Sequence, residues 1–157
     1  MALLKIYKEA DDFMVALTQA MKDMIGAQLN FLSTADEDGN PQVGPKGTMR
    51  VLDDTHLIYN EQTGKQAWHN LHVNGKAAVA TVDHAALKGF RFEGHVEGFH
   101  DDDQIYQDSV KFAEERHLPA VIAAVVIAID RVYLLDAGPH AGDLEEGVAK
   151  PTDHFTH

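Results

Sequence analysis

Two stretches of this sequence carry side chains suited to binding a small anion. The first is the run Pro45-Lys46-Gly47-Thr48-Met49-Arg50. Lys46, Thr48 and Arg50 can donate hydrogen bonds to an anion or to a polar ring, and Gly47 permits close approach of the backbone. The alternative is an ordinary strand whose polar residues face solvent.

The second stretch, Asn60 to Gln66, lies just before a predicted helix. The pair Thr63-Gly64 leaves backbone N–H groups free at the positive end of that helix, and Lys65 and Gln66 fall in its first turn. This arrangement suits a phosphate group, although the spacing of a Walker loop is absent. The alternative is a capped helix with a solvated lysine. Because the two stretches are predicted on neighbouring strands, they can converge on one ligand.

Both stretches fall inside a cationic part of an acidic protein. The chain has 13 Lys and Arg against 25 Asp and Glu, and residues 39–91 hold six of those cations but only four of those carboxylates. A local positive region in a negative molecule favours a small anionic ligand, because the remaining surface would repel a polyanion. The sequence therefore predicts no nucleic-acid partner.

Composition narrows the class of protein further. The chain has 157 residues, the length of one ordinary domain, and no cysteine, which excludes disulfides, thiolate zinc sites and iron–sulfur clusters. The first residues lack the apolar core of a signal peptide. The longest apolar run, Ala120 to Ile129, is about half of what a membrane span needs. We therefore expect a cytoplasmic, soluble protein with no membrane partner.

Hydrophobic periodicity and turn signals predict helices interleaved with strands. Apolar residues from Phe13 to Met24 recur at helical spacing and stop near Gly26, and Thr63 is the candidate cap of the second helix. Asp36 to Asn40 reads as a hairpin turn. The expected elements are a helix at 13–26, strands at 28–34, 42–52 and 56–60, a helix ending at 74–75, strands at 76–83 and 88–100, a helix at 101–118, and a strand at 120–135.

Neighbouring strands with short connections favour an antiparallel sheet, closed into a barrel. No repeat or linker divides the chain. Residues 1–136 are therefore expected to form a single domain, and residues 137–157 a loop-like tail.

The sequence resembles the FMN-binding split-barrel flavoproteins, the family of pyridoxamine 5′-phosphate oxidase and of small bacterial FMN-binding proteins. The resemblance covers roughly residues 10–136. It is carried by Leu32 to Pro41, Pro45 to Gly47, Thr63 to Leu71, the strand Gly89 to Gly94 and the final apolar strand. It implies a mainly β fold with flanking helices, an antiparallel six-stranded split β-barrel, and a homodimer with FMN bound at its interface.

The resemblance also implies a role for each residue of the two stretches. Lys46, Gly47, Thr48 and Met49 would line the flavin ring. Asn60, Glu61, Gln62 and Thr63 would flank the ring and the ribityl chain. Lys65 and Gln66, with Thr63, would hold the phosphate, and Arg50 is a second phosphate candidate. The ring would be covered by residues near Trp68, or by the C-terminal loop of a partner subunit around Pro139 and His140.

The implied activity is flavin-dependent redox chemistry, with a small molecule or a protein as electron donor or acceptor. No residue stands out as an acid, base or nucleophile, which suits a flavoprotein because the cofactor performs the redox chemistry. The sequence lacks a match to the substrate-phosphate residues and the C-terminal signature of true pyridoxamine 5′-phosphate oxidases. Synthesis of pyridoxal phosphate is therefore not expected.

Two alternatives stay open. The chain could be a non-enzymatic flavin carrier or electron-transfer module, or a split barrel that binds haem or the deazaflavin F420. His69 and His72 could share one face of the second helix as metal ligands. No carboxylate or third histidine lies near them in the sequence, so no metal site is expected there.

Overall fold

The computed structural model describes residues 15–154. In this part of the chain, three α-helices and one 3₁₀ helix accompany eight strands. None of these helices has both the length and the apolar character needed to cross a bilayer. The helices are α2 (Gln19–Ala27), α3 (Gln66–Asn74), α4 (Gln104–Glu115) and η1 (Pro151–His154). The strands are β1 (Asn30–Ala35), β2 (Pro41–Pro45), β3 (Arg50–Asp53), β4 (His56–Glu61), β5 (Lys76–Asp83), β6 (Lys88–His100), β7 (Ala123–Leu134) and β8 (Leu144–Gly147).

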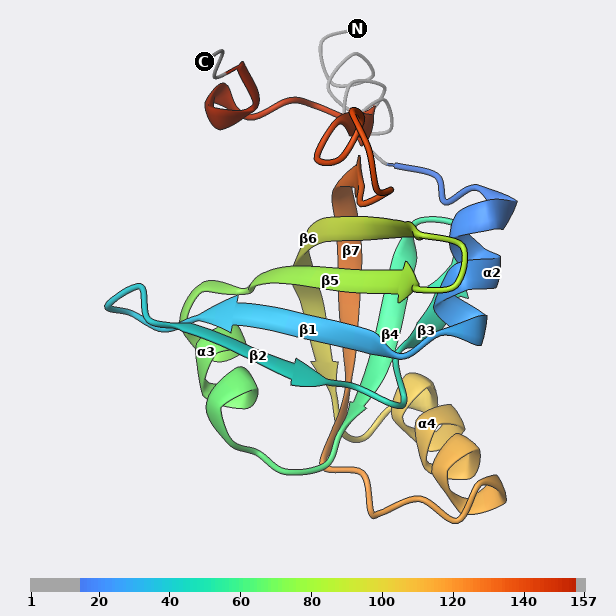
Figure 1. Cartoon of the computed structure of the whole chain (residues 1–157). Helices are drawn as coiled ribbons and strands as arrows, with labels where there is room; N and C mark the ends of the chain where they lie inside the picture. The colour runs from blue at the N-terminus through green and yellow to red at the C-terminus, as the bar shows by residue number, and fades with distance from the viewer. Residues whose placement is uncertain (1–14, 155–157) are drawn as a thin grey trace, which may run out of the picture.

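All the strands form one antiparallel sheet, in the order β2-β1-β5-β6-β7-β4-β3, with β8 paired to β7. The two ends of this path, β2 and β3, follow one another in the chain and are joined by residues 46–49. The sheet therefore curls, and Figure 1 shows its two halves facing each other. Among the described residues β2 does not pair with β3, so the sheet stays open along this edge and the expected closed barrel is corrected to a split one. This confirms the prediction of a mainly β, antiparallel split-barrel fold.

The segment that contains β2 and β3 corrects one prediction. A single strand was expected at 42–52, but the chain leaves the sheet at Lys46 and re-enters it at Arg50. The N–H of Met49 donates to the carbonyl of Lys46 at 3.0 Å, which closes a turn. The interruption follows from the pairing, because β2 pairs with β1 whereas β3 pairs with β4. This split and the unexpected β8 turn the six predicted strands into eight.

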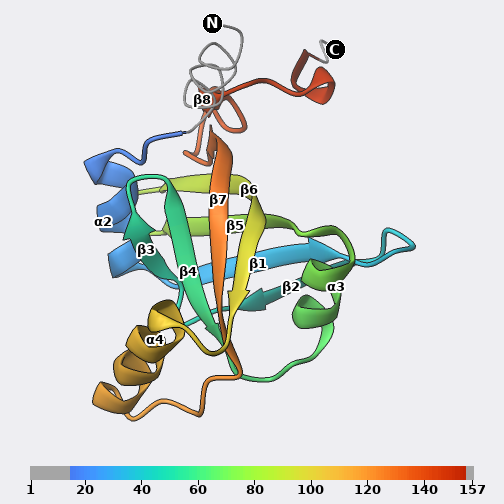
Figure 2. The ribbon, with the colours of Figure 1, turned by 180° about the vertical axis from the view of Figure 1, so that it is seen from behind.

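The core fills the space between the two halves of the sheet. Leu32, Val79, Phe92 and Ile127 come from four different strands and are almost fully buried, since alternate residues of each strand point inward. Helices α2 and α3 pack against this core on opposite sides, as Figure 1 shows. Helix α4 lies outside the barrel near β4 and β3, where its Ile105 packs on a smaller apolar cluster (Figure 2).

The helix ends differ from the expectations in two places. Helix α2 is capped by Thr18, whose hydroxyl accepts from the N–H of Met21 at 3.3 Å, and it continues through Gly26 to Ala27. The expected start at Phe13 lies outside the described residues. Thr63 does not cap α3, because its hydroxyl donates to Glu61 and Lys65 takes the N-cap position. The predicted stop at 74–75 is confirmed, since Gly75 has the left-handed φ of 68°.

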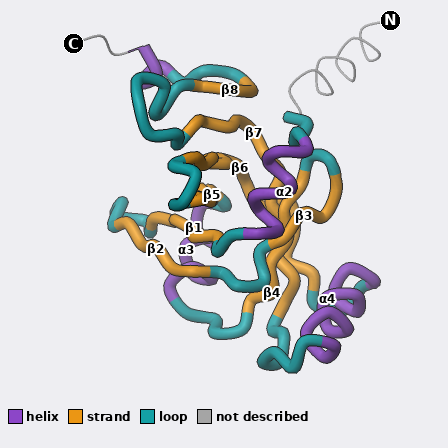
Figure 3. The backbone as a smooth tube through the Cα atoms, turned by 45° about the vertical axis from the view of Figure 1, so that its right-hand side comes forward, coloured by secondary structure: helices purple, strands orange, loops and turns teal. Residues whose placement is uncertain are grey.

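The tail, expected to be loop-like over 137–157, contains two short regular elements, β8 and η1, within the part that the structure describes. Strand β8 pairs with the end of β7, and Figure 3 shows the two side by side. Two β7 side chains fix the chain beyond it. Arg131 Nε donates to the carbonyl of Val148 at 3.0 Å, and the Tyr133 hydroxyl donates to Asp153 Oδ2 at 2.8 Å. These long-range partners leave no periodic signal in the tail itself.

The outer face of β2, β1 and β5 carries exposed apolar side chains. Phe31, Val43 and Val82 are 41%, 63% and 45% exposed. Phe31 lies opposite Pro45 in β2 and opposite Ala80 in β5, so this apolar surface is continuous across three strands. In Figure 1 these strands face the viewer, and none of the described helices passes in front of them.

Candidate functional site

The centre of the candidate site is the carboxylate of Glu61, the last residue of β4. One of its oxygens, Oε1, accepts hydrogen bonds from three consecutive backbone N–H groups, those of Gln62 at 3.1 Å, Thr63 at 3.0 Å and Gly64 at 3.0 Å. The Thr63 hydroxyl donates to the same oxygen at 3.2 Å. We call the N–H groups of residues 62–64 the amide cradle. The sequence predicted that these N–H groups are free for a phosphate, and this is wrong because the chain's own carboxylate holds them.

The other oxygen of Glu61 faces the first stretch. Lys46 Nζ lies 3.8 Å from Oε2, and the Tyr59 hydroxyl donates to it at 3.2 Å. Lys46 Nζ also lies 5.1 Å from the centre of the Tyr59 ring. The Glu61 side chain is 1% exposed and that of Lys46 is 16% exposed, so this ion pair is largely shielded from water.

The contacts of Glu61 settle its charge. Burial on its own raises the pKa of this carboxyl, but the N–H groups of Thr63 and Gly64, with Lys46, outweigh burial and hold its pKa below the usual range. Glu61 is therefore ionised at neutral pH. Burial, followed by the Glu61 charge, raises the pKa of the Tyr59 hydroxyl, which keeps it protonated as a donor.

Thr48 and Asn60 join the two stretches through their backbone and hydroxyl groups. The N–H of Asn60 donates to Thr48 Oγ1 at 2.9 Å, and this hydroxyl lies 3.4 Å from the carbonyl of Asn60. Both residues are buried. Met49 is 4% exposed and packs in the main core, so a ligand can reach only its backbone.

Arg50 is fixed by the end of β4 and by α4. Its guanidinium donates to the carbonyl of Thr48 at 2.8 Å, to Asn60 Oδ1 at 3.2 and 3.3 Å, and to Ser109 Oγ at 3.2 Å. It also lies 3.8 Å from the centre of the Phe112 ring. Burial, with the nearby Arg116, lowers the pKa of Arg50 to about 10. These contacts assign Arg50 a positioning role here, and a phosphate role would require it to leave them.

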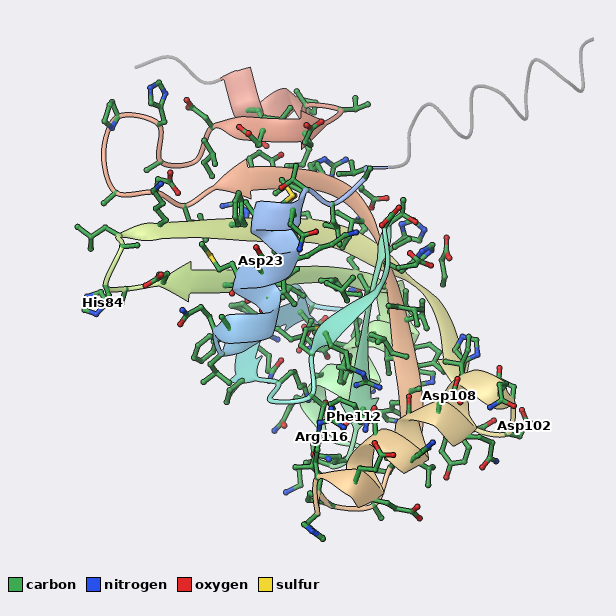
Figure 4. All side chains as sticks on the ribbon, turned by 90° about the vertical axis from the view of Figure 1, so that its right-hand side faces the viewer. Asp23, His84, Asp102, Asp108, Phe112 and Arg116 are labelled. Atoms are coloured by element: carbon green, nitrogen blue, oxygen red, sulfur yellow. The ribbon has the colours of Figure 1, made fainter. Side chains whose placement is uncertain are left out.

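Sequence reasoning missed the contribution of α4 to this site. Ser109 accepts from Arg50, and its carbonyl accepts from Asn60 Nδ2 at 3.2 Å. Phe112 stacks against both Arg50 and Arg116, each 3.8 Å from its ring centre. Figure 4 labels Phe112 on α4 and Arg116, the residue that follows its last turn. No local pattern could have revealed these partners, because Ser109 lies 59 residues from Arg50 in the chain.

Four of the predicted residues stay open to solvent. Gly47, Thr63, Lys65 and Gln66 are exposed. Lys65 stands at the N-cap of α3 without a side-chain cap, and within residues 15–154 it has no ion-pair partner. The structure therefore brings the two stretches together around Glu61, while only the second stretch leaves a cation available to a ligand.

The histidines of α3 and of the tail loop have partners within the chain. His69 Nε2 lies 2.8 Å from Glu37 Oε2, whereas His72 stacks on Phe99 with ring centres 3.8 Å apart. Among residues 15–154, no group of three or more His, Asp or Glu side chains is arranged for a metal ion. Pro139 and His140 are exposed, and His140 Nδ1 lies 2.9 Å from Asp143 in its own loop.

A separate cavity of about 630 Å³ opens on the outer face of the sheet. None of the predicted cofactor residues lines it. Most of its charged groups pair with one another, since Lys150 lies 2.6 Å and Arg131 3.7 Å from Glu93, and His95 lies 2.9 Å from Asp130. Lys76 also lines the cavity. The chemistry of the amide cradle therefore identifies the candidate site better than cavity size does.

Comparison with known proteins identifies the family. The family model for pyridoxamine 5′-phosphate oxidase matches residues 17–136. The chain belongs to this family. The crystal structure of HupZ from Group A Streptococcus is 39% identical, covers 80% of this chain and 99% of that chain, and has a TM-score of 0.73. A family member from Lactobacillus delbrueckii is 34% identical, covers 75% of this chain and 93% of that chain, and has a TM-score of 0.66.

More distant similarities are found as well. An uncharacterized protein of Methanocaldococcus jannaschii is 28% identical over 140 residues, which are 85% of this chain and 90% of that protein. Solved structures below 20% identity share the fold alone. They include an FMN-binding protein from Syntrophomonas wolfei with a TM-score of 0.68, an F420 reductase with 0.56, and HutZ, the heme storage protein of Vibrio cholerae, with 0.55.

Proposed function

We propose that this member of the pyridoxamine 5′-phosphate oxidase family is an FMN-binding flavoprotein, an oxidoreductase that passes electrons between a reductant and a small acceptor. The observation that carries the proposal is the convergence of Lys46 and Thr63 on the Glu61 carboxylate. This contact unites the two stretches from which the sequence predicted one site. FMN, when bound, would supply the hydride or electron transfer.

The local chemistry suits an oxyanion. Three N–H groups converge on a single oxygen in the amide cradle, and that oxygen belongs to a carboxylate, so the loop is demonstrably shaped for a negatively charged group. Lys65 and Gln66 follow at the exposed first turn of α3, where the helix dipole favours a phosphate. We place the FMN phosphate at Thr63, Lys65 and Gln66. It has to compete there with Glu61.

The remaining residues of the site form and hold the turn against which the flavin ring would lie. Gly47 is exposed at the turn that follows Lys46, and the backbone there can approach a flat ring closely. Thr48, Arg50 and Asn60 are mutually bonded and hold this turn against β4. Their role is to position the turn, because their polar atoms are already used within the chain.

We further propose a homodimer that forms through the apolar outer face. Phe31, Val43 and Val82 expose a continuous apolar surface on β1, β2 and β5. Exposed apolar patches of this kind mark association sites. A second copy would bury this patch and enclose the cofactor that a single protomer leaves open.

The test of FMN binding is the absorption spectrum of the purified protein, followed by titration of the apoprotein with FMN. The proposal expects a flavin spectrum, or quenching of FMN fluorescence that saturates at one FMN per chain. A haem or deazaflavin spectrum would assign the site to another cofactor, and a protein that binds none of the three would reject the proposal.

A second candidate is a non-enzymatic flavin carrier or electron-transfer module. It is favoured by one observation: the ionisable groups next to the cradle, Lys46, Tyr59 and Glu61, are bonded to one another. None of them is poised to move a proton to or from a substrate. Steady turnover of reduced nicotinamide with a small acceptor would support the enzyme, whereas electron exchange with a protein and no such turnover would support the carrier.

A further inference from the structure

The amide cradle has a resident anion, and this has consequences for the ligand. Every N–H group of residues 62–64 donates to Glu61 Oε1, and the Thr63 hydroxyl adds a fourth donor. A ligand phosphate cannot use these donors while the carboxylate holds them. A phosphate and Glu61 therefore compete for the same hydrogen bonds.

The charges around the amide cradle also disfavour a phosphate relative to Glu61. Lys46 is the cation nearest to Glu61, at 3.8 Å, and the pair cancels in charge. Arg50 is committed to Thr48, Asn60 and Ser109. A phosphate at this loop would therefore meet one uncompensated cation, Lys65, and one buried carboxylate whose charge repels it.

Burial makes the carboxylate a persistent competitor. Glu61 is almost completely buried, and so is Tyr59, which donates to it. An ionised group in such a place stays only because its hydrogen bonds offset the loss of hydration. Displacing Glu61 from the cradle requires those bonds to be broken, and this weakens the binding of whatever replaces it.

From these contacts we infer that Glu61 sets the charge selectivity of the cofactor site. Its carboxylate takes the position that a ligand phosphate needs, so the protein discriminates poorly between FMN and its phosphate-free counterpart riboflavin. A phosphate occupies the cradle only when Glu61 is displaced. The inference rests on the proposed flavin binding and names the residue that limits it.

The test compares wild type with Glu61→Gln, which keeps the size and the acceptor oxygen but removes the charge. Both proteins are titrated with FMN and with riboflavin, after circular dichroism has verified folding. We expect Glu61→Gln to bind FMN about tenfold more tightly and riboflavin unchanged, since removing one like charge in a shielded site contributes on this scale. Glu145→Gln, an exposed residue of β8, is the control for net charge and should change neither affinity.

An unchanged or reduced preference for FMN in Glu61→Gln would overturn the inference and leave Glu61 as a residue that only shapes the loop. Flavin binding by wild type would still support the proposed function in that case. If no variant binds either flavin, the proposed function fails, and the inference is decided with inorganic phosphate. Amide NMR signals of Thr63 and Gly64 should then shift with phosphate in Glu61→Gln and not in wild type. Equal responses in the two proteins would overturn it.

A measurement on wild type alone guards against a variant that does not fold. Binding of FMN should shift the Thr63 and Gly64 amide signals strongly, because their acceptor changes from carboxylate to phosphate, and riboflavin should leave them in place. Amide signals that stay unmoved while FMN binds would contradict displacement of Glu61.

Discussion

Lys46 and Thr63 meet on the two oxygens of one buried carboxylate. Lys46 Nζ lies 3.8 Å from Glu61 Oε2, and the N–H of Thr63 lies 3.0 Å from Glu61 Oε1. This relationship ties the β2–β3 turn to the loop before α3. It places two cationic stretches, separate in the sequence, around a single point.

The proposed binding of the FMN phosphate at the N-terminus of α3 predicts the effect of a double substitution. Lys65→Ala with Gln66→Ala removes the exposed cation and its neighbour, so FMN affinity should fall by about tenfold or more. Riboflavin affinity should stay the same, since it lacks the phosphate. Fluorescence titration measures both, and Lys88→Ala, an exposed cation at the start of β6, is the matched control. Equal FMN affinity in the double variant and wild type would remove these residues from the phosphate site.

The contacts of Arg50 predict a loss of stability rather than of ligand contact alone. Arg50→Met would leave Asn60 Oδ1 and Ser109 Oγ without their donor. The free energy of unfolding, measured with urea, should fall by about 2–4 kcal/mol, because hydrogen bonds to a charged group inside the protein are lost. Lys111→Met, on the exposed side of α4, should change it little. A variant as stable as wild type that has lost FMN binding would instead make Arg50 a direct ligand.

Alanine substitutions at two glycines should change the stability of the protein in opposite directions. A Cβ on Gly94 would overlap the carbonyl oxygen of Ala128 at an irregularity in the pairing of β6 with β7, so Gly94→Ala should destabilise the fold by about 3 kcal/mol or more. A Cβ on Gly26, in the last turn of α2, meets nothing. Gly26→Ala should stabilise the protein by about 0.5–1 kcal/mol, because alanine is the better helix former. Thermal unfolding of both variants checks this pair, and similar effects would contradict the packing of β6 on β7.

His56 predicts a pH dependence of stability. Its Nδ1 lies 2.8 Å from Asp53 and its Nε2 lies 2.7 Å from Glu97, which links the β3–β4 hairpin to β6. Burial lowers the pKa of His56, but the two carboxylates outweigh burial and raise its pKa. The extra stability is therefore fully present below the pKa of the unfolded chain and is lost as the pH rises through the folded pKa.

The variant His56→Gln isolates this effect. The difference in unfolding free energy between wild type and variant should be about 0.5–1 kcal/mol larger at pH 5 than at pH 9. Urea unfolding at the two pH values measures it. A difference that grows toward alkaline pH would show that the imidazole is held neutral.

Much of the fold could be predicted because its signals are local. The alternation from Phe90 to Val96 fixed β6, and the Asp36–Asn40 turn joined β1 to β2. The break at residues 46–49 could not be read in the same way, because it arises from a change of pairing partner, from β1 to β4. The β8 strand depends likewise on Arg131 and Tyr133, which are distant in sequence.

In the candidate site, too, some features could be predicted from local sequence and others depend on the folded structure. Residue types and spacing placed Lys46, Thr63 and Lys65 in one region, and the resemblance to a family supplied the cofactor. The hydrogen bonds of Glu61 were not predictable, since an acid before a Thr-Gly pair reads equally well as a solvated residue. Only the folded structure, in which Glu61 is buried and accepts from residues 62–64, shows that it fills the amide cradle.

The measurement that tests the central claim most directly is the titration of the purified apoprotein with FMN, followed by absorption and fluorescence. The account predicts saturable binding of one FMN per chain, which Lys65→Ala with Gln66→Ala weakens. A protein that shows no flavin spectrum as purified, and leaves the spectrum and fluorescence of added FMN unchanged, would contradict it.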